Sequence, residues 1–309
     1  MRALSGALLG IILAVLNLPA TAQPLDKPDL IQTFPVGNSP RYLAFDGENV
    51  WVTNLDDNTV MKLRPSDGAI LGTFRVGEDP LWIIFDGEDI WVCNRNGYSL
   101  TKLAVDGTVL GTFWAGVGPG GLAWDGANIW VSNFWAGTVT KMRGSNGEWL
   151  DVFQVGDYPE GVIFDGKNIW VANGGSASVT KLRASDGLLL ATVPVGLGPW
   201  DLVYDGNKVW VTNPGDSTVT AIRVRDATVI GTFHARTYPQ GIAFDGANIW
   251  VAAANSETGV VKRALARSGI STGSFVLHDF AQGILFDGTS IWAANYLSNT
   301  VTKITRTLP

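Results

Sequence analysis

Few side chains in this chain suit acid–base or nucleophilic chemistry. The 309 residues include two histidines, His234 and His278, and one cysteine, Cys93. Neither histidine stands in a His-x-His pair, and the sequence lacks a Gly-x-Ser-x-Gly turn, a complete Gly-x4-Gly-Lys-Ser/Thr phosphate loop and a His-Glu-x-x-His motif. The sequence therefore favours a binding protein over an enzyme. If the protein is an enzyme, we expect His278, Glu160 and Asp201 to supply its acid–base groups.

Carboxylates could also hold a divalent cation. Glu160, Asp157, Asp201 and Asp216 could place oxygen atoms around a central ion, and calcium or magnesium needs about six ligands. The sequence has no calcium-loop spacing, and turns commonly carry aspartates for backbone reasons alone. We therefore predict no cofactor, with a central divalent cation as the alternative.

A regular repeat determines where these groups must lie. An aromatic-Asp-Gly turn followed by Ile-Trp or Val-Trp occurs seven times, and the steps between the tryptophans are 40, 39, 40, 40, 40 and 42 residues. A period of that length, built from short strands and tight turns, is typical of a propeller blade. We expect the large indoles to fill the wedges between blades rather than to bind a ligand. The seven are Trp51, Trp91, Trp130, Trp170, Trp210, Trp250 and Trp292.

Each repeat predicts four antiparallel strands. In the fourth repeat they span 161–164, 169–173, 178–182 and 188–195, and an Asp-Gly pair forms the first hairpin turn. The fold class is therefore all-β, and we predict a seven-bladed β-propeller with four-stranded antiparallel blades.

The seventh repeat ends without a fourth strand. Residues 30–36 match the fourth strand of the first repeat, 70–76, so we expect the N-terminal strand to complete the last blade. This pairing closes the ring and leaves no long open edge at the seam. Residues 23–309 are then a single propeller domain.

Two further features of the repeat are predicted to be structural. Cys93 takes the place of small residues in the other repeats, so we expect a small buried strand residue rather than a reactive thiol. A lysine recurs once per repeat, with Ala221 breaking the series, and the sixth repeat has one extra residue between 252 and 258. The lysines are Lys62, Lys102, Lys141, Lys181, Lys262 and Lys303.

The N-terminus has the features of a secretory signal peptide. Arg2 supplies a positive start, residues 7–18 an apolar stretch, and Ala20-Thr21-Ala22 a small-x-small cleavage site. We therefore expect residues 1–22 to be removed and the mature protein to be periplasmic or secreted, with no membrane span. With one cysteine, an internal disulfide is excluded.

Positions that vary within the regular repeat are the best candidates for a ligand site. The loop leaving each fourth strand and the loop between the second and third strands should share one face, and variable loops on a rigid scaffold carry function. Several of these positions follow the loop proline, or follow Ala281 in the last repeat. We predict a ligand-binding face made of Arg41, Tyr42, Trp82, Arg95, Tyr98, Trp135, Glu160, Trp200, Asp201, Gln240 and Gln282.

Aromatic rings with amide and charged neighbours suit a protein, peptide or carbohydrate partner. The formal net charge of −6 argues against nucleic acid as a partner, because proteins that bind nucleic acid normally present a basic surface. Single-stranded DNA binding, which stays as an alternative, would rest on Arg41 and Arg95 among the aromatics. We expect a monomer.

The repeat pattern Gly-x-x-Pro-x-Gly-Ile-Ala-Phe-Asp-Gly-x-Asn-Ile-Trp-Val-x-Asn, seen at 156–173, resembles the seven-bladed propellers of the YVTN and NHL type. It is also similar, more distantly, to the virginiamycin B lyase family. The resemblance covers essentially the whole mature chain, and these families include binding proteins, lyases and lactonase-like enzymes. Lyase chemistry would imply a histidine base, a carboxylate and magnesium near the channel mouth. His278 could reach that position, whereas His234 falls near the end of an outer strand.

Overall fold

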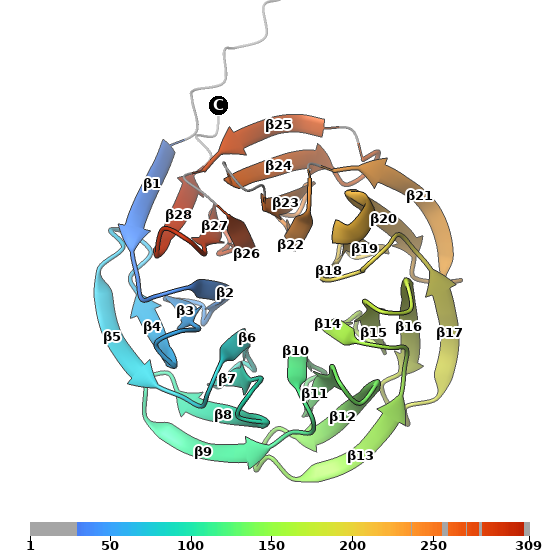
Figure 1. The fold of residues 1–309 in the computed structure, drawn as a ribbon, viewed down its shortest axis with the longest axis horizontal. Coiled ribbons are helices and arrows are strands. Elements are labelled where there is room, and N and C mark those ends of the chain that lie inside the picture. The colour runs from blue at the N-terminus through green and yellow to red at the C-terminus, as the bar shows by residue number, and fades with distance from the viewer. Residues whose placement is uncertain (1–29, 236, 255–258, 270, 278–279, 306–309) are drawn as a thin grey trace, which may run out of the picture.

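The chain forms a closed ring of seven β-sheets. The computed structural model describes residues 30–235, 237–254, 259–269, 271–277 and 280–305. Within these residues, 28 strands form seven four-stranded antiparallel sheets around a central axis (Figure 1). The predicted seven-bladed β-propeller is confirmed. The described residues include no helix long and apolar enough to cross a membrane.

In each blade the strands follow chain order from the axis to the rim, except at the seam in the last blade. The innermost strands are β2 (Pro40–Phe45), β6 (Pro80–Phe85), β10 (Pro119–Trp124), β14 (Pro159–Phe164), β18 (Leu202–Tyr204), β22 (Pro239–Phe244) and β26 (Ala281–Phe286). The second strands are β3 (Val50–Asn54), β7 (Asp89–Asn94), β11 (Asn128–Asn133), β15 (Asn168–Asn173), β19 (Lys208–Asn213), β23 (Asn248–Ala254) and β27 (Ser290–Asn295).

The two remaining positions complete each blade toward the rim. The third strands are β4 (Thr59–Leu63), β8 (Ser99–Ala104), β12 (Thr138–Arg143), β16 (Ser178–Arg183), β20 (Thr218–Arg223), β24 (Gly259–Leu265) and β28 (Thr300–Thr305). The outer strands are β5 (Ile70–Arg75), β9 (Val109–Trp114), β13 (Trp149–Gln154), β17 (Leu189–Pro194), β21 (Thr228–His234), β25 (Ser271–Val276) and β1 (Leu30–Pro35). A 3-10 turn, η1 (Pro214–Asp216), follows β19.

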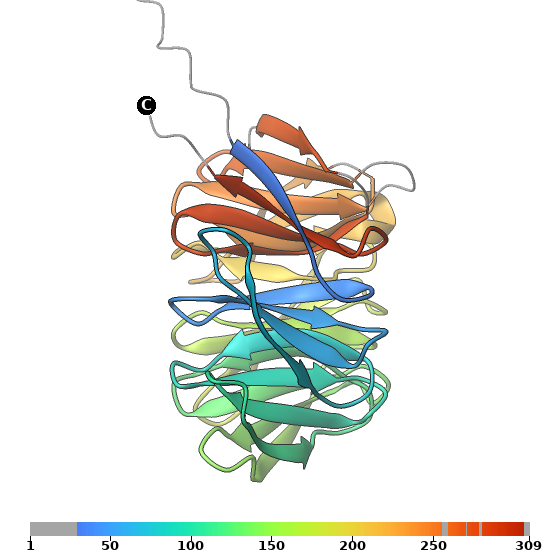
Figure 2. The same cartoon turned by 90° about the vertical axis from the view of Figure 1, so that its left-hand side faces the viewer.

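The N-terminal strand closes the ring, as predicted. β1 pairs antiparallel with β28 over six residues, from Leu30 opposite Thr305 to Pro35 opposite Thr300, and the two strands lie side by side in Figures 1 and 2. The Phe34 ring stacks on Trp292 of the last blade, with 5.8 Å between ring centroids. The seam is therefore held by strand pairing and by an aromatic contact together.

Each repeated aspartate fixes its tryptophan at a blade junction. In all seven blades the Asp of the aromatic-Asp-Gly turn accepts two backbone N–H groups with Oδ1, and accepts the tryptophan Nε1–H with Oδ2 at 2.7–2.8 Å. The indoles are fully or almost fully buried. The tryptophans thus pack the core, as expected, because the turn satisfies their only polar atom.

The recurring lysines tie neighbouring blades together. The Lys181 ammonium lies 4.7 Å from the Trp170 ring centroid and donates to the Val224 carbonyl of the next blade at 2.6 Å. Where Ala221 interrupts the series, Lys208 from the adjacent strand takes over, donating to the Ala266 carbonyl at 2.8 Å. The equivalent lysines at the other junctions are Lys62, Lys102, Lys141 and Lys303.

The expectation that Lys262 continues this series was wrong. Arg263, not Lys262, stands opposite Trp250 in the strand register, and its guanidinium carbon lies 5.5 Å from that ring. Trp250 and Arg263 are 13 residues apart, whereas Trp170 and Lys181 are 11 apart, so the preceding connection holds two extra residues rather than the one expected. Lys262 is therefore one position away from the place opposite Trp250, and adjacent strand residues point to opposite faces of a sheet. Lys262 instead donates to the His234 carbonyl at 3.0 Å.

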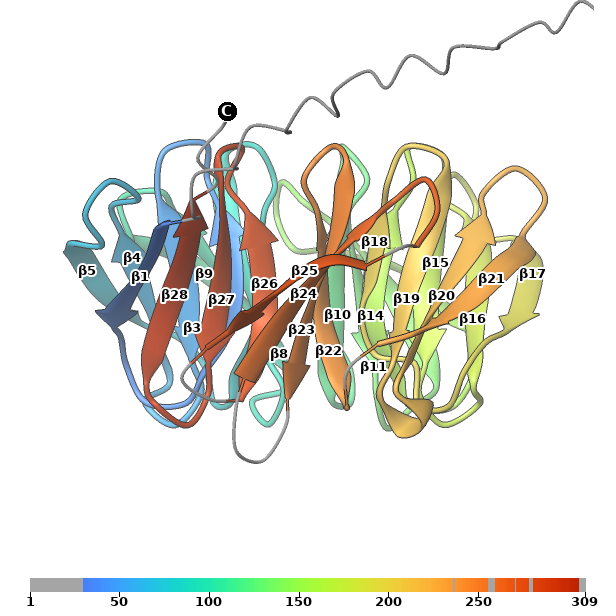
Figure 3. The ribbon, with the colours of Figure 1, turned by 90° about the horizontal axis from the view of Figure 1, so that it is seen from above.

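The strands run between the two faces of the disc, as Figure 3 shows with the ring seen edge-on. The Gly-x-x-Pro loops and the loops between second and third strands meet on one of these faces. Leu55 N–H donates to Ser39 C=O at 3.1 Å, and Gly174 N–H donates to Tyr158 C=O at 2.9 Å. This predicted arrangement is confirmed, and we call this surface the loop face.

Candidate functional site

Three large aromatic side chains lie together inside the ring. The Tyr42 ring stacks on Trp82 with centroids 4.2 Å apart, and the Trp200 ring lies 6.0 Å from Trp82. The Trp200 Nε1–H donates to the Tyr42 hydroxyl at 2.7 Å. Tyr42 and Trp82 come from blades one and two and Trp200 from blade five, so the contact spans the central axis. We call these three residues the axial aromatic cluster.

In other blades the position equivalent to Tyr42 and Trp82 is a glycine, as at Gly161 and Gly283, and this glycine is required for steric reasons. A Cβ on Gly161 would lie 2.7 Å from the Trp200 carbonyl oxygen, and a Cβ on Gly283 would lie 2.3 Å from the Arg41 carbonyl oxygen. Neighbouring innermost strands therefore approach backbone to backbone at these places, and only glycine fits. The bulky residues at Tyr42 and Trp82 are departures from that rule that fill the axis.

A buried ion pair crosses the loop face from blade two to blade four. The Arg95 Nη2 donates to Glu160 Oε2 at 2.6 Å, and the Arg95 guanidinium carbon lies 5.0 Å from the Phe134 ring centroid. A Cβ on Gly120 of the intervening blade would lie 3.4 Å from Arg95 Nη2. The missing side chain at Gly120 thus leaves the space through which Arg95 reaches Glu160.

In the described part of the chain, only one oxygen of the Glu160 carboxyl has a hydrogen-bond partner. Its side chain is 2% exposed, and its Oε1 has no hydrogen-bond partner among the described residues. Burial raises its pKa to about 7, against the opposing effect of the Arg95 charge and hydrogen bond. A buried acceptor without a partner is costly unless something donates to it.

Asp201 faces the axis from blade five and is bound by backbone groups. Its Oδ1 accepts the Leu202 N–H at 2.8 Å, and its Oδ2 accepts the Ile242 N–H of the next blade at 3.3 Å. Burial raises the pKa of Asp201 to about 7, although its side chain stays partly accessible. The backbone pairing with β19 continues beside it, because Trp200 N–H donates to Thr212 C=O at 2.9 Å and Thr212 N–H donates to Asp201 C=O at 3.0 Å.

Arg41 makes its side-chain contacts with blade seven. Its Nη1 donates to the Gln282 Oε1, and its guanidinium carbon lies 4.3 Å from the Tyr296 ring centroid. Burial lowers the pKa of Arg41. Gln240 is also buried, and its Oε1 has no hydrogen-bond partner among the described residues.

An open pocket lies beside the axial aromatic cluster on the loop face. It has a volume of about 270 Å³. Glu160 and Trp200 connect it to the cluster, and the exposed rings of Tyr158 and Tyr238 stand at its edge. Its lining residues are Phe134, Tyr158, Glu160, Gly174, Gly175, Gly198, Trp200, Pro214, Gly215 and Tyr238. We call this the loop-face pocket.

Most of the predicted residues fall into three separate groups in the structure. The axial aromatic cluster, Arg95 and Glu160 form one connected set, and Arg41 with Gln282 forms a second. Tyr98 and Trp135 make an edge-on contact with centroids 6.0 Å apart, next to Phe134 and outside the lining of the loop-face pocket.

The three other aromatic residues of the pocket did not enter the predicted set: Phe134, Tyr158 and Tyr238. A signal for two of them was present, because Tyr158 and Tyr238 both directly precede the loop proline. Both adopt the left-handed backbone region, with φ of 49° and 58°. In the loops that contain the proline, the prediction considered only the residues after it. Phe134 gave no such signal, since only its ring contacts with Tyr158 and Arg95 reveal its place.

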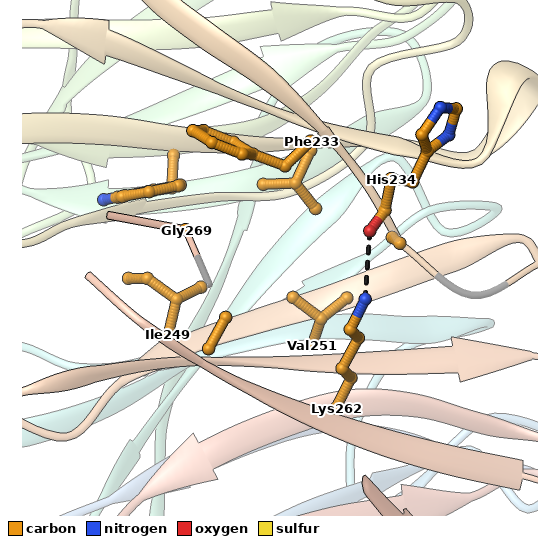
Figure 4. Close-up of a pocket in the computed structure, with 10 residues that line it drawn as sticks. Phe233, His234, Ile249, Val251, Lys262 and Gly269 are labelled. Carbon is orange, nitrogen blue, oxygen red and sulfur yellow. Dashed lines mark hydrogen bonds between the residues drawn. The ribbon is translucent and has the colours of Figure 1, made fainter. Parts of the chain in front are cut away.

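The two histidines do not form a site in the described structure. His278 lies outside the described residues. His234 ends an outer strand, and Figure 4 shows its imidazole directed away from a gap of about 30 Å³ between blades five and six. Across residues 30–235 and the described segments that follow, no group of three or more His, Cys, Asp or Glu side chains could hold a metal ion. Cys93 is fully buried, as predicted, and burial raises the pKa of its thiol.

The raised carboxyl pKa values predict a protein that loses stability as the pH rises. Glu160 has an ordinary pKa of 4.5 and a folded-state pKa of about 7. Between these values the folded state binds more protons than the unfolded state, so the free energy of unfolding falls with increasing pH. We expect a loss of up to about 3 kcal/mol from Glu160 between pH 5 and pH 8, and a smaller loss from the partly accessible Asp201.

Melting temperatures from pH 5 to pH 8 test this prediction. Glu160→Gln should flatten the profile, because the amide does not titrate, whereas Asp186→Asn in an exposed turn should leave its slope unchanged. A Glu160→Gln profile as steep as that of the wild type would show that Glu160 does not titrate in this range.

Comparison with known proteins gives similarity of structure alone. No family model matches the chain, and no curated protein matches it. The structure of a streptogramin B lyase is similar, with a TM-score of 0.77 and 18% sequence identity, covering 90% of this chain and 98% of that one. A hydrazine synthase structure from Kuenenia stuttgartiensis also has a TM-score of 0.77 and 18% identity, covering 87% of this chain and 96% of that one. These similarities support the predicted resemblance to virginiamycin B lyase-like propellers at the level of the fold.

Proposed function

We propose that this propeller is a binding module that holds its ligand in the loop-face pocket. The observation that carries the proposal is the Glu160 carboxyl, which lines an open, aromatic-walled pocket while its Oε1 lacks a hydrogen-bond partner. Apolar walls with one or two placed polar groups are typical of small-ligand sites. The pocket volume of about 270 Å³ suits a small molecule or one side chain of a peptide.

The rigidity of the surrounding groups supports this proposal. Glu160 is held by Arg95, and Trp200 is held by Tyr42 through a hydrogen bond. Binding groups that are fixed before the ligand arrives lose little entropy on binding. The axial aromatic cluster lies behind the pocket, so we place the ligand on the loop face rather than within the channel.

A lyase or lactonase-like enzyme is the second candidate. The supporting observation is that Glu160 and Asp201 both have a pKa of about 7, which suits a general base at neutral pH. Against it, Asp201 accepts two backbone N–H groups and Glu160 is paired with Arg95, so the two carboxyls make separate contacts. Incubation of bound compounds with the protein, followed by mass spectrometry, separates the candidates. Turnover that Glu160→Gln abolishes would identify an enzyme.

A thermal-shift screen of saccharides, peptides and small metabolites tests the proposed site. A bound compound raises the melting temperature of the native state. We expect active compounds to lose most of this shift in Tyr158→Asn, which removes an exposed ring, and asparagine tolerates the left-handed backbone found there. Trp114→Leu, which removes an exposed indole from the outer strand β9, should keep the full shift. Equal shifts in wild type and Tyr158→Asn would reject the loop-face pocket as the site.

We further propose that the protein works after export, as a monomer in the periplasm or outside the cell. The basis is the predicted signal peptide at 1–22. N-terminal sequencing of the mature protein should begin at Gln23, and an intact Met1 would contradict the proposal.

A further inference from the structure

We infer that the ligand of the loop-face pocket carries an alkylammonium group, which binds between the aromatic walls and the Glu160 carboxylate. This inference rests on the proposed function, because it specifies the chemistry of a ligand in that same pocket. Charge, ring exposure and the unpartnered carboxyl oxygen support it independently.

The loop face carries an excess of negative charge among its described loop residues. These include one cationic side chain, Arg95, and six acidic side chains, four of which belong to loops of blades one and two. Two of the acidic residues adjoin the pocket, because Asp157 precedes Tyr158 and Asp216 follows Gly215. The six are Asp56, Asp57, Glu78, Asp79, Asp157 and Asp216. This field attracts cations and repels anionic ligands such as phosphates and nucleic acid.

Two cations of the described structure, Arg95 and Arg41, lie near Glu160, and neither is bonded to both of its carboxylate oxygens. Arg95 bonds to Oε2 and lies over the Phe134 ring, so its charge is engaged behind the pocket wall. The other oxygen, Oε1, has no partner among the described residues. Glu160 is part of the pocket lining, so an ammonium group in the pocket would lie beside its carboxylate and pair with it, with the strength of a charge-assisted hydrogen bond.

Four aromatic rings line the pocket, and aromatic rings suit a cationic ligand. Tyr158 and Tyr238 are 52% and 44% exposed, and Trp200 and Phe134 complete the aromatic wall. The face of an aromatic ring carries partial negative charge, so rings surrounding a small site favour ammonium groups, and tryptophan does so most strongly. A neutral sugar would also cover the rings, but it would gain nothing from the surrounding carboxylates.

Cation binding should strengthen as the pH rises through about 7. An ammonium group beside Glu160 favours the ionised carboxyl, so affinity should increase as that carboxyl loses its proton. The charged and titratable groups facing Glu160 are Arg95, Arg41, Tyr42 and Cys93. Burial raises the pKa values of the Tyr42 hydroxyl and the Cys93 thiol, so Glu160 is the member of this group that titrates near neutrality.

Calorimetric titration of the mature protein with matched probes tests the inference. The probes are choline, its neutral isostere 3,3-dimethylbutan-1-ol, Nα-acetyl-lysine amide and cellobiose, each at pH 6 and pH 8. We expect at least one cationic probe to bind ten or more times more tightly than the isostere, with several-fold higher affinity at pH 8. The stronger of the two cationic probes distinguishes a methylated head group from a lysine side chain.

Three variants test whether the cationic probe binds in the loop-face pocket, and one of them is chosen because it should fold normally. Glu160→Gln should weaken the cationic probe at least tenfold and remove its pH dependence. Asp157→Asn, at the exposed rim, should weaken it two- to threefold without affecting folding, whereas Asp67→Asn in an exposed turn should have no effect. Asp157→Asn also tests the charge argument if Glu160→Gln fails to fold.

The possible failures are distinct. Equal affinity for choline and its isostere, or binding of cellobiose that Tyr158→Asn removes while neither cation binds, would overturn the inference and leave the proposed function standing. Cation binding that Tyr158→Asn and Glu160→Gln do not change would place the site elsewhere and overturn both.

Discussion

Removal of the N-terminal strand, residues Leu30–Pro35, is expected to lower the melting temperature by roughly 10–20 °C. The deletion breaks the pairing with β28 and removes the Phe34 ring from Trp292. Phe34 is partly buried. Loss of a fully buried phenylalanine costs about 3–5 kcal/mol, so the ring and the strand pairing together account for a loss of that order, and 1 kcal/mol corresponds to about 2–4 °C in a protein of comparable size. Differential scanning calorimetry of chains that begin at Asp26 and at Val36 measures the effect.

Two comparisons show whether the closed seam is the cause. Phe34→Ala keeps the strand and removes only the ring, so it should give an intermediate loss. A synthetic peptide covering residues 30–36 should raise the melting temperature of the shortened chain, because an extended peptide can add to an open sheet edge. An unchanged melting temperature in the shortened chain would show that the ring does not depend on this strand.

Asp165→Ala is expected to destabilise the protein by roughly 3–5 kcal/mol. The Asp165 carboxylate accepts the backbone N–H groups of Lys167 and Asn168 and the Trp170 Nε1–H at 2.7–2.8 Å. Trp170 is fully buried. Removal of the Asp165 carboxylate therefore leaves the indole N–H without an acceptor at a place that water cannot reach, and each such group costs about 1–3 kcal/mol. Burial of Asp165 opposes its ionisation, but the hydrogen bonds from Trp170 and Asn168 outweigh burial and lower its pKa.

Asp186→Ala is the matched control for this prediction. Asp186 also stands in a turn of blade four, but it pairs with Arg183 at an exposed position, with side chains 52% and 41% exposed. Exposed ion pairs contribute about 0–1 kcal/mol, so the control should stay within about 1 kcal/mol of the wild type in urea unfolding. Equal losses in Asp165→Ala and Asp186→Ala would contradict the role assigned to the repeated aspartates.

The fold could be predicted because the same local interactions recur in every blade. The spacing from Asp165 to Trp170 serves both the turn and the blade junction, and the same spacing appears seven times in the sequence. The strand boundaries predicted for the fourth repeat agree with the structure within two residues. The prediction for Lys262 was wrong because the connection before it holds two extra residues rather than one, so the lysine spacing in the sequence no longer matches the strand pairing.

The candidate site could be predicted only in part. The residues after the loop proline vary because they face the axis, and this signal identified Tyr42, Trp82, Glu160 and Trp200. It could not show that Arg95, which lies 65 residues before Glu160 in the chain, crosses the space above Gly120 to reach it. This contact depends on the absence of a side chain at Gly120 in the intervening blade, and no pattern within a single repeat predicts it.

The sequence by itself determined the seven blades, the closing strand and the packing role of the tryptophans, because each follows from contacts within one repeat or between adjacent ones. Only the tertiary structure decided which of the variable residues share a site. Trp200 meets Tyr42 across the axis and Tyr158 joins Phe134 at the pocket wall, and these distances depend on the closure of the whole ring. The few side chains able to do chemistry therefore acquire their surroundings from the ring: Glu160 becomes a buried acceptor in an aromatic pocket, while His234 is left on the outer surface.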